Sequence, residues 1–227
     1  MILAIYYVAL VGIFLPVACI RSYYKLKAGA PYPPKLKLHR QTLLMHAMFL
    51  AIALFIAKSL GIVLFPAAAP RVSDIALGAG VLITFVSAMY PLWKYKAARQ
   101  PEKIYRRLPQ SYSELGLWSI VSLSAGFVEE IAYRGVLFQL IFYWVGNWWI
   151  AALFAAISFA LGHAIQGWKS TLIIFAFAVA FQGLVWATGT LYVAMAVHAI
   201  YDFVAGFAYA ILYKKSAIEP MAGAETA

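Results

Sequence analysis

Two adjacent carboxylates and an arginine lie inside a stretch whose composition is that of a membrane span. They are Glu129, Glu130 and Arg134, in the segment GFVEEIAYRGVLFQ. A single charge near the centre of a bilayer costs roughly 2.5–3.5 kcal/mol on insertion scales. Because the chain keeps three such groups within six residues, we expect them to belong to a polar site that functions inside the membrane.

The spacing of these groups predicts different positions for the two glutamates. Successive residues of an α-helix point about 100° apart, so Glu129 and Glu130 cannot share one helix face. Glu130 and Arg134 are four residues apart, so their side chains meet, and an ion pair offsets much of the cost of burying either charge. We therefore expect Glu130 and Arg134 to pair while Glu129 faces a cavity. The alternative is that all three charges form one fixed packing network.

Two later apolar stretches add further ionisable groups. FALGH places Phe159 four residues before His163, and HAIYD places His198 four residues before Asp202. Each pair shares a helix face, so Phe159 stacks on His163, and Asp202 can orient the His198 ring and fix its tautomer. Either histidine could instead be a hydrogen-bonded packing group. Together, Glu129, His163, His198 and Asp202 can activate water and stabilise an oxyanion, or they can bind a metal.

The rest of the sequence argues against several common catalytic classes. It contains neither the HExxH arrangement of many zinc peptidases nor a GxSxG motif. Cys19 is the only cysteine, so an intramolecular disulfide and a cysteine-based metal cluster are both excluded. It also lies far along the chain from the other polar groups. We therefore expect neither a serine nor a cysteine nucleophile.

The composition is that of an integral membrane protein. Of 227 residues, 65% are hydrophobic and 11% are charged, whereas a soluble domain is nearer one half apolar and one quarter charged. A spanning helix needs about 20 apolar residues, which leaves no room for a large soluble domain. We predict an all-α polytopic transmembrane helix bundle that forms one membrane domain over residues 1–227, with the polar site inside it. Seven spans are expected, with an eighth or a re-entrant piece in the fourth stretch as the alternative, at about 1–20, 43–65, 72–93, 115–142, 148–166, 170–187 and 190–212.

Basic residues are distributed unevenly between the predicted loops. With the N-terminus outside, fifteen Lys and Arg residues in loops and the C-terminal tail face the cytoplasm, and only Arg71 faces outwards. The positive-inside rule explains the net charge of +10 better than nucleic-acid binding does, because the chain contains no basic soluble module. We therefore expect the lipid bilayer as a partner, no nucleic acid, an outside N-terminus and a cytoplasmic C-terminus.

Four further polar residues lie in or near the predicted spans. Lys58 is close enough to a span end for its side chain to reach the interface. His46 and Asp74 lie near span ends and are expected to be interfacial. Gln182 either lines the cavity or bonds between helices.

Three ordered motifs resemble those of a family of intramembrane peptidases, the CAAX-protease and bacteriocin-processing family. EEIAYR matches the motif EExxxR, FALGH matches FxxxH, and HAIYD matches HxxxD or HxxxN, in the same order and in apolar spans. The resemblance covers roughly residues 115–206, which would form the catalytic core, and the first hundred residues match only as generic membrane helices. It implies an intramembrane endopeptidase that cleaves a membrane-associated protein or peptide.

The resemblance also implies a role for each motif residue. Glu129 would be the general base, acting with His163 on a water molecule, and His198 with Asp202 would stabilise the oxyanion. The supporting residues would be Glu130, Arg134 and Phe159. The CAAX endopeptidases of the family have Asn at the position of Asp202, and an ionised Asp cannot donate a hydrogen bond directly. The substrate therefore stays open between a prenylated C-terminus, a peptide precursor and a sorting tail with its own span.

The resemblance implies a peptidase without a cofactor, and other functions of the same residues stay as alternatives. The family is thought to use a glutamate rather than a metal, so we expect a glutamic-type peptidase without a cofactor, with zinc as the alternative. A non-proteolytic scaffold or immunity protein of the same fold is a second function, and a proton-coupled transporter using the same acids is a third. We expect a multi-pass protein of a prokaryotic plasma membrane.

Overall fold

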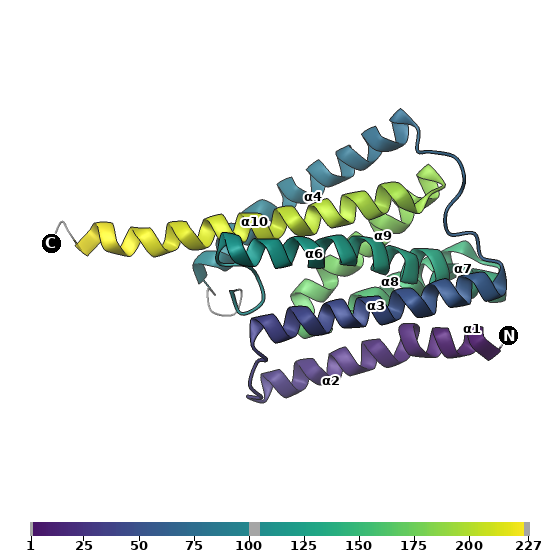
Figure 1. The fold of residues 1–227 in the computed structure, drawn as a ribbon, viewed down its shortest axis with the longest axis horizontal. Helices are drawn as coiled ribbons and strands as arrows, with labels where there is room; N and C mark the ends of the chain where they lie inside the picture. The colour runs from purple at the N-terminus through teal and green to yellow at the C-terminus, as the bar shows by residue number, and fades with distance from the viewer. Residues whose placement is uncertain (1, 100–104, 225–227) are drawn as a thin grey trace.

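The computed structural model describes residues 2–99 and 105–224, the part 214–224 by its backbone alone. Residues 100–104, in the predicted basic loop before the fourth span, lie outside the described residues. Every regular element in the described ranges is a helix, which confirms the predicted all-α bundle (Figure 1). The elements are α1 (Ile2–Tyr7), η1 (Val8–Phe14), α2 (Leu15–Lys27), α3 (Lys35–Leu60), α4 (Val72–Arg99), α6 (Tyr112–Glu129), η2 (Glu130–Leu137), α7 (Phe138–Val145), α8 (Trp148–Gly162), η3 (Ala164–Gln166), α9 (Trp168–Thr188) and α10 (Leu191–Ala224).

Several of these elements join end to end into long helices that can cross a membrane. Six are long and apolar enough within the described residues, namely Ile2–Lys27, Lys35–Leu60, Val72–Arg99, Tyr112–Val145, Trp168–Thr188 and Leu191–Tyr213. The chain is therefore a multi-pass integral membrane protein. The long fourth stretch is one continuous helical pass made of α6, η2 and α7, so it holds no additional span and no re-entrant piece.

The predicted fifth span is shorter than expected. It was expected over 148–166, but α8 ends at Gly162 and is followed by the short turn η3 and by Gly167 with φ +94°. At 1.5 Å per residue α8 is only about 22 Å long, less than the roughly 30 Å of a hydrocarbon core. The positive φ of Gly167 suits a residue without a Cβ and separates α8 from α9. His163 therefore lies just beyond the end of a helix.

The first predicted loop is also mostly helical. Helix α2 continues to Lys27, and α3 begins at Lys35, directly after Pro34. Prolines do interrupt the chain, because Pro31, Pro33 and Pro34 all fall in the gap between the two helices. Their effect is confined to that gap, since a helix can start immediately after a proline. Helix α3 thus begins well before the expected start of the second span.

Two of the long helices contain a π-helical segment, and a carbonyl of each segment accepts a hydrogen bond from a side chain of another helix. Pro16 has no N–H to donate to the carbonyl four residues earlier, that of Gly12, and Ser158 donates its hydroxyl to this oxygen at 3.0 Å. In η2, the carbonyl of Ala132 accepts a hydrogen bond from the Tyr7 hydroxyl at 3.0 Å. The π segment η2 covers the EEIAYR motif from Glu130 onwards, and π segments occur frequently at functional sites.

Helix α6 lies at the centre of the bundle and positions the polar groups. It packs between α3 and α10, while α8 packs between α2 and α9, and α4 lies along α10 (Figure 1). The approach of α6 to α10 is close at Gly126, where a Cβ atom would lie 2.6 Å from the backbone nitrogen of Ala199. A glycine therefore lets the helix that carries Glu129 lie against the helix that carries His198.

Candidate active site

Three histidines surround the carboxylate of Glu129. The Nε2 atom of His46 lies 3.3 Å from Oε1, and the Nε2 atoms of His163 and His198 lie 3.8 Å and 3.7 Å from Oε2. These histidines come from α3, from the end of α8 and from α10, so the site joins parts of the chain that are far apart in sequence. The two carboxylate oxygens thus have separate sets of neighbours.

Each of the three rings is held through its other nitrogen. The Nδ1 contacts are His46 with Ser124 Oγ at 2.9 Å, His163 with the Phe159 carbonyl at 2.9 Å, and His198 with Glu130 Oε1 at 2.8 Å. A carbonyl or a carboxylate can only accept, so the Nδ1 atoms of His163 and His198 carry the proton in these bonds. A hydrogen bond at one ring nitrogen sets what the other nitrogen presents, and here the other nitrogen faces Glu129 in all three rings.

Glu130 and Arg134 form the ion pair that their spacing predicts. Their side chains are fully buried and the nearest atoms are 3.2 Å apart. Arg134 also donates to the carbonyl of Ala178 at 3.3 Å and lies over the Phe159 and Phe181 rings, 4.5 Å and 5.7 Å from their centroids. The guanidinium is therefore held by a carboxylate, a carbonyl and two aromatic faces, which replace water around a buried cation.

The orientation of His198 comes from a different acid than expected. Glu130 accepts the hydrogen bond from His198 Nδ1, whereas Asp202 Oδ2 lies 3.7 Å from Nε2 and its side chain is partly exposed. Glu129 and Glu130 therefore reach the same imidazole from its two nitrogens. Adjacent residues of a helix point in different directions, yet both glutamates can reach one imidazole because Nδ1 and Nε2 lie on different edges of the ring. The expected contact of Phe159 with His163 is present, with ring centroids 4.6 Å apart.

His46 is the site residue that the sequence interpretation missed. It was expected at the interface, but only 3% of it is exposed. Because α3 begins at Lys35, His46 lies eleven residues into the helix, or roughly 16 Å along its axis, which is about half of a hydrocarbon core. His39 and His46 are seven residues apart, on the same buried face as Phe49 and Ala53. The helical spacing of the two histidines with these apolar residues is the sequence feature that could have placed His46 inside the bundle.

The other polar residues lie as follows. Asp74 is in the first turn of α4 and pairs with Arg71 at 3.0 Å, as suits a span end. Lys58 is exposed in the last turn of α3. Gln182 is buried in α9, and its Oε1 has no hydrogen-bond partner among the described residues.

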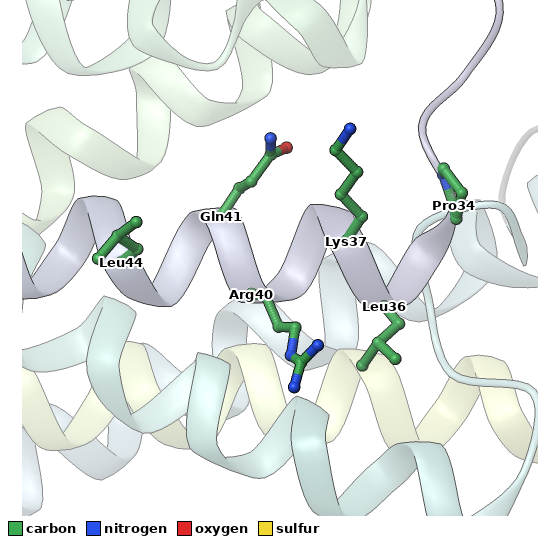
Figure 2. Close-up of a pocket in the computed structure, with 6 residues that line it drawn as sticks. All are labelled: Pro34, Leu36, Lys37, Arg40, Gln41 and Leu44. Carbon is green, nitrogen blue, oxygen red and sulfur yellow. The ribbon is translucent and has the colours of Figure 1, made fainter.

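Part of the site is exposed. His46 and His198 are almost fully buried, whereas 16% of the Glu129 side chain, 25% of His163 and 31% of Asp202 are exposed. A hollow lies elsewhere, along the first turns of α3, and is lined by Pro34, Leu36, Lys37, Arg40, Gln41 and Leu44 (Figure 2). That groove contains none of the groups around Glu129, so the two are separate features.

The arrangement offers acid–base chemistry on a neutral molecule brought to Glu129. A carboxylate with imidazole nitrogens on both of its oxygens can accept a proton and pass it on. Within the described residues, no group of three or more His, Cys, Asp or Glu side chains has the arrangement of a metal site. Imidazole and carboxylate are nevertheless ligand types that zinc accepts, so the zinc alternative needs a direct test.

Comparison with known proteins gives one match. Residues 111–204 match the family described as "Type II CAAX prenyl endopeptidase Rce1-like". No curated protein and no solved structure matches the chain. The matched segment contains all three motifs, from Glu129 to Asp202, and leaves α1 to α4 outside. Residues 111–204 are thus similar to the Rce1-like CAAX-type proteases, and the resemblance that the motifs indicated is confirmed over this segment.

Proposed function

We propose that the protein is an intramembrane endopeptidase of the glutamic type, which hydrolyses a peptide bond of a membrane-associated protein or peptide. The observation that supports this proposal is the position of the Glu129 carboxylate, whose Oε2 faces the Nε2 atoms of both His163 and His198. A base between two imidazoles, partly exposed inside a membrane protein, has the means to activate water and to move protons. The family match supports the same reaction class.

The proposed reaction uses water as nucleophile, without a covalent intermediate. Glu129 takes one proton from a water molecule that His163 helps to position, and the water oxygen attacks the peptide carbonyl carbon. The carbonyl oxygen becomes an oxyanion. The proton held by Glu129 then passes to the leaving nitrogen as the C–N bond breaks. The products are a carboxylic acid end, whose proton is then lost to water, and an amine end.

His198 is the proposed oxyanion donor. Its Nδ1–H donates to Glu130, and in the proposed scheme its Nε2 also carries a proton. The Nε2–H would then donate a hydrogen bond to the developing oxyanion. Such a hydrogen bond is stronger in a water-poor site. Asp202 need not donate a hydrogen bond itself in this scheme, and its Oδ2 lies 3.7 Å from the same Nε2 atom.

The direct test is the variant Glu129→Gln, which preserves size and removes the base. We expect cleavage to fall by roughly 10²–10⁴-fold, the usual contribution of a positioned base. Mass spectrometry of cleaved ends after co-expression with tailed candidate substrates measures it. The matched control is Glu114→Gln, a carboxylate on the same long helix but outside the site. Wild-type cleavage by Glu129→Gln would refute the assignment.

The cofactor requirement is tested on the same purified protein. We expect activity to persist after prolonged incubation with a strong chelator. Loss of activity that zinc alone restores would replace the glutamic mechanism by a metal-dependent one. Substrate-dependent ion flux in proteoliposomes without cleavage would replace both by transport.

The substrate class is addressed by the choice of tail. A prenylated C-terminus, an unmodified peptide precursor and a sorting tail with its own span should be offered in parallel. We propose a membrane-associated tail in each case, because the site lies deep among spanning helices. We also propose that the N-terminus is outside and the C-terminus cytoplasmic, since the loop between α2 and α3 and residues 105–111 before α6 lie at the end of the bundle opposite the start of α1 (Figure 1).

A further inference from the structure

His46 makes a buried contact with the proposed base from a part of the chain that the family match does not cover. The match begins at residue 111, whereas His46 lies in α3. Its side chain is 4% exposed, and its Nε2 atom is 3.3 Å from Glu129 Oε1. The other oxygen of the same carboxylate, Oε2, faces His163 and His198. One carboxylate oxygen is therefore directed to α3 and the other to the motif histidines.

The orientation of the His46 ring is set by a chain of hydrogen bonds. Ser124 donates its hydroxyl to the carbonyl of Val121 at 2.8 Å. A hydroxyl has one proton to donate, so Ser124 Oγ accepts at its contact with His46 Nδ1, which is 2.9 Å long. His46 Nδ1 therefore carries a proton, and Nε2 points towards Glu129. One proton shared between His46 Nε2 and Glu129 Oε1 makes this contact a hydrogen bond, whichever of the two atoms carries it.

The effect of this contact on Glu129 follows from the freedom of the side chain. A glutamate has three rotatable bonds, and its carboxylate can turn about the last of them with little restraint. The structure gives Glu129 no hydrogen bond to Glu130 or Arg134, and the closest approach of both His163 and His198 is to Oε2. His46 is thus the group that fixes Oε1 and, through it, the direction of Oε2.

We propose that His46 is a positioning residue for Glu129, which holds Oε1 so that Oε2 stays directed at the water and the two motif histidines. The inference rests on the proposed function, because it assigns a role in the same reaction. It assigns His46 no contact with the substrate. Loss of His46 should therefore lower kcat and leave KM unchanged.

The test compares four variants of the full-length protein in detergent micelles. His46→Leu removes the contact, and we expect kcat to fall by about 100-fold, as for a misplaced catalytic group. His46→Gln keeps an N–H donor at the reach of Nε2 and should restore about a tenth or more of the wild-type kcat. Ser124→Ala leaves Nδ1 without its acceptor and should lower kcat several-fold.

His39→Gln is the matched control. His39 lies seven residues before His46 on the same buried face of α3, and its Nε2 bonds the carbonyl of Arg107 at 2.9 Å, away from Glu129. If the buried histidines of α3 had only a structural role, substitutions at His39 and His46 would lower the activity alike. We expect wild-type kcat and KM for His39→Gln.

A second measurement reads the contact without catalysis. The carboxylate stretching bands that Glu129→Gln removes from the infrared spectrum should shift in His46→Leu and stay in place in His39→Gln. If His46→Leu does not fold, the carboxylate bands and kcat of His46→Gln and Ser124→Ala test the role of His46 instead.

The outcomes separate the two proposals. Wild-type kcat and unshifted bands in folded His46→Leu, alongside an inactive Glu129→Gln, overturn the role of His46 and leave the proposed function intact. An active Glu129→Gln overturns the proposed function, and the infrared bands still report whether His46 holds the carboxylate.

Discussion

The start and the middle of the long helix Tyr112–Val145 both carry a glutamate paired with a cation, in opposite surroundings. At the start, Glu114 Oε2 accepts hydrogen bonds from Lys35 Nζ and from the Gln110 backbone, each at 2.7 Å, and its side chain is 38% exposed. In the middle, Glu130 and Arg134 are fully buried. Water can replace a lost partner at the first pair but not at the second, so the same chemistry has different consequences.

The two regions also contain contrasting glycines. A Cβ atom on Gly116, near the start, would meet nothing within 4 Å, whereas one on Gly126 would lie 2.6 Å from the backbone of α10. The start of the helix is thus a capped end with space around it. The middle is a close-packed, water-poor junction where each group depends on its neighbours, which is what a site that must hold several groups in fixed positions needs.

The largest difference is expected when the buried pair is broken. Arg134→Met removes the cation from the buried Glu130 carboxylate and leaves His198 as its hydrogen-bond partner, and we expect the free energy of unfolding to fall by about 3–5 kcal/mol. Denaturation by sodium dodecyl sulfate in mixed micelles measures this. Arg134→Lys keeps the charge but loses the planar fork, so its free energy of unfolding should lie between those of the wild type and Arg134→Met. An unchanged stability of Arg134→Met would mean that the middle of the helix tolerates exchange as its start does.

A smaller effect is expected when the close approach to α10 is filled. Gly126→Ala should lower the free energy of unfolding by roughly 1–3 kcal/mol, because the backbone of α10 must shift to admit the methyl group. Cleavage should fall as well, since α10 carries His198. The control is Gly116→Ala on the same helix, which should be neutral or raise stability by about 0.5–1 kcal/mol. Equal effects at both positions would contradict the packing argument.

The smallest effect is expected at the exposed pair. Glu114→Gln removes the charge opposite Lys35 but keeps an acceptor for the Gln110 N–H, so the free energy of unfolding should change by about 0–1 kcal/mol. The difference from wild type should shrink further as salt is raised, because exposed charges are screened. A loss as large as that of Arg134→Met would show that this end of the helix is as dependent on its pair as the middle.

Much of the candidate site could be read from local spacing. Glu130 and Arg134, like Phe159 and His163, are four residues apart, and a helix brings such residues together whatever surrounds it. The apolar stretches likewise fixed the fold class, since a chain in lipid must satisfy its backbone within helices. The errors in the extents of the helices were at helix ends. Gly162 ends α8 early, and α3 begins at Lys35 rather than near residue 43.

The sequence by itself determined that this is a helical membrane protein with acids, an arginine and histidines in its spans, because composition and helical periodicity are local properties. Only the tertiary structure decided which nitrogen meets which oxygen. His46 bonds Ser124 across 78 positions and His198 bonds Glu130 across 68, and neither spacing carries a helical period. Such contacts depend on how α3 and α10 pack against the central helix, which is set by many side chains at once and by the space that Gly126 leaves.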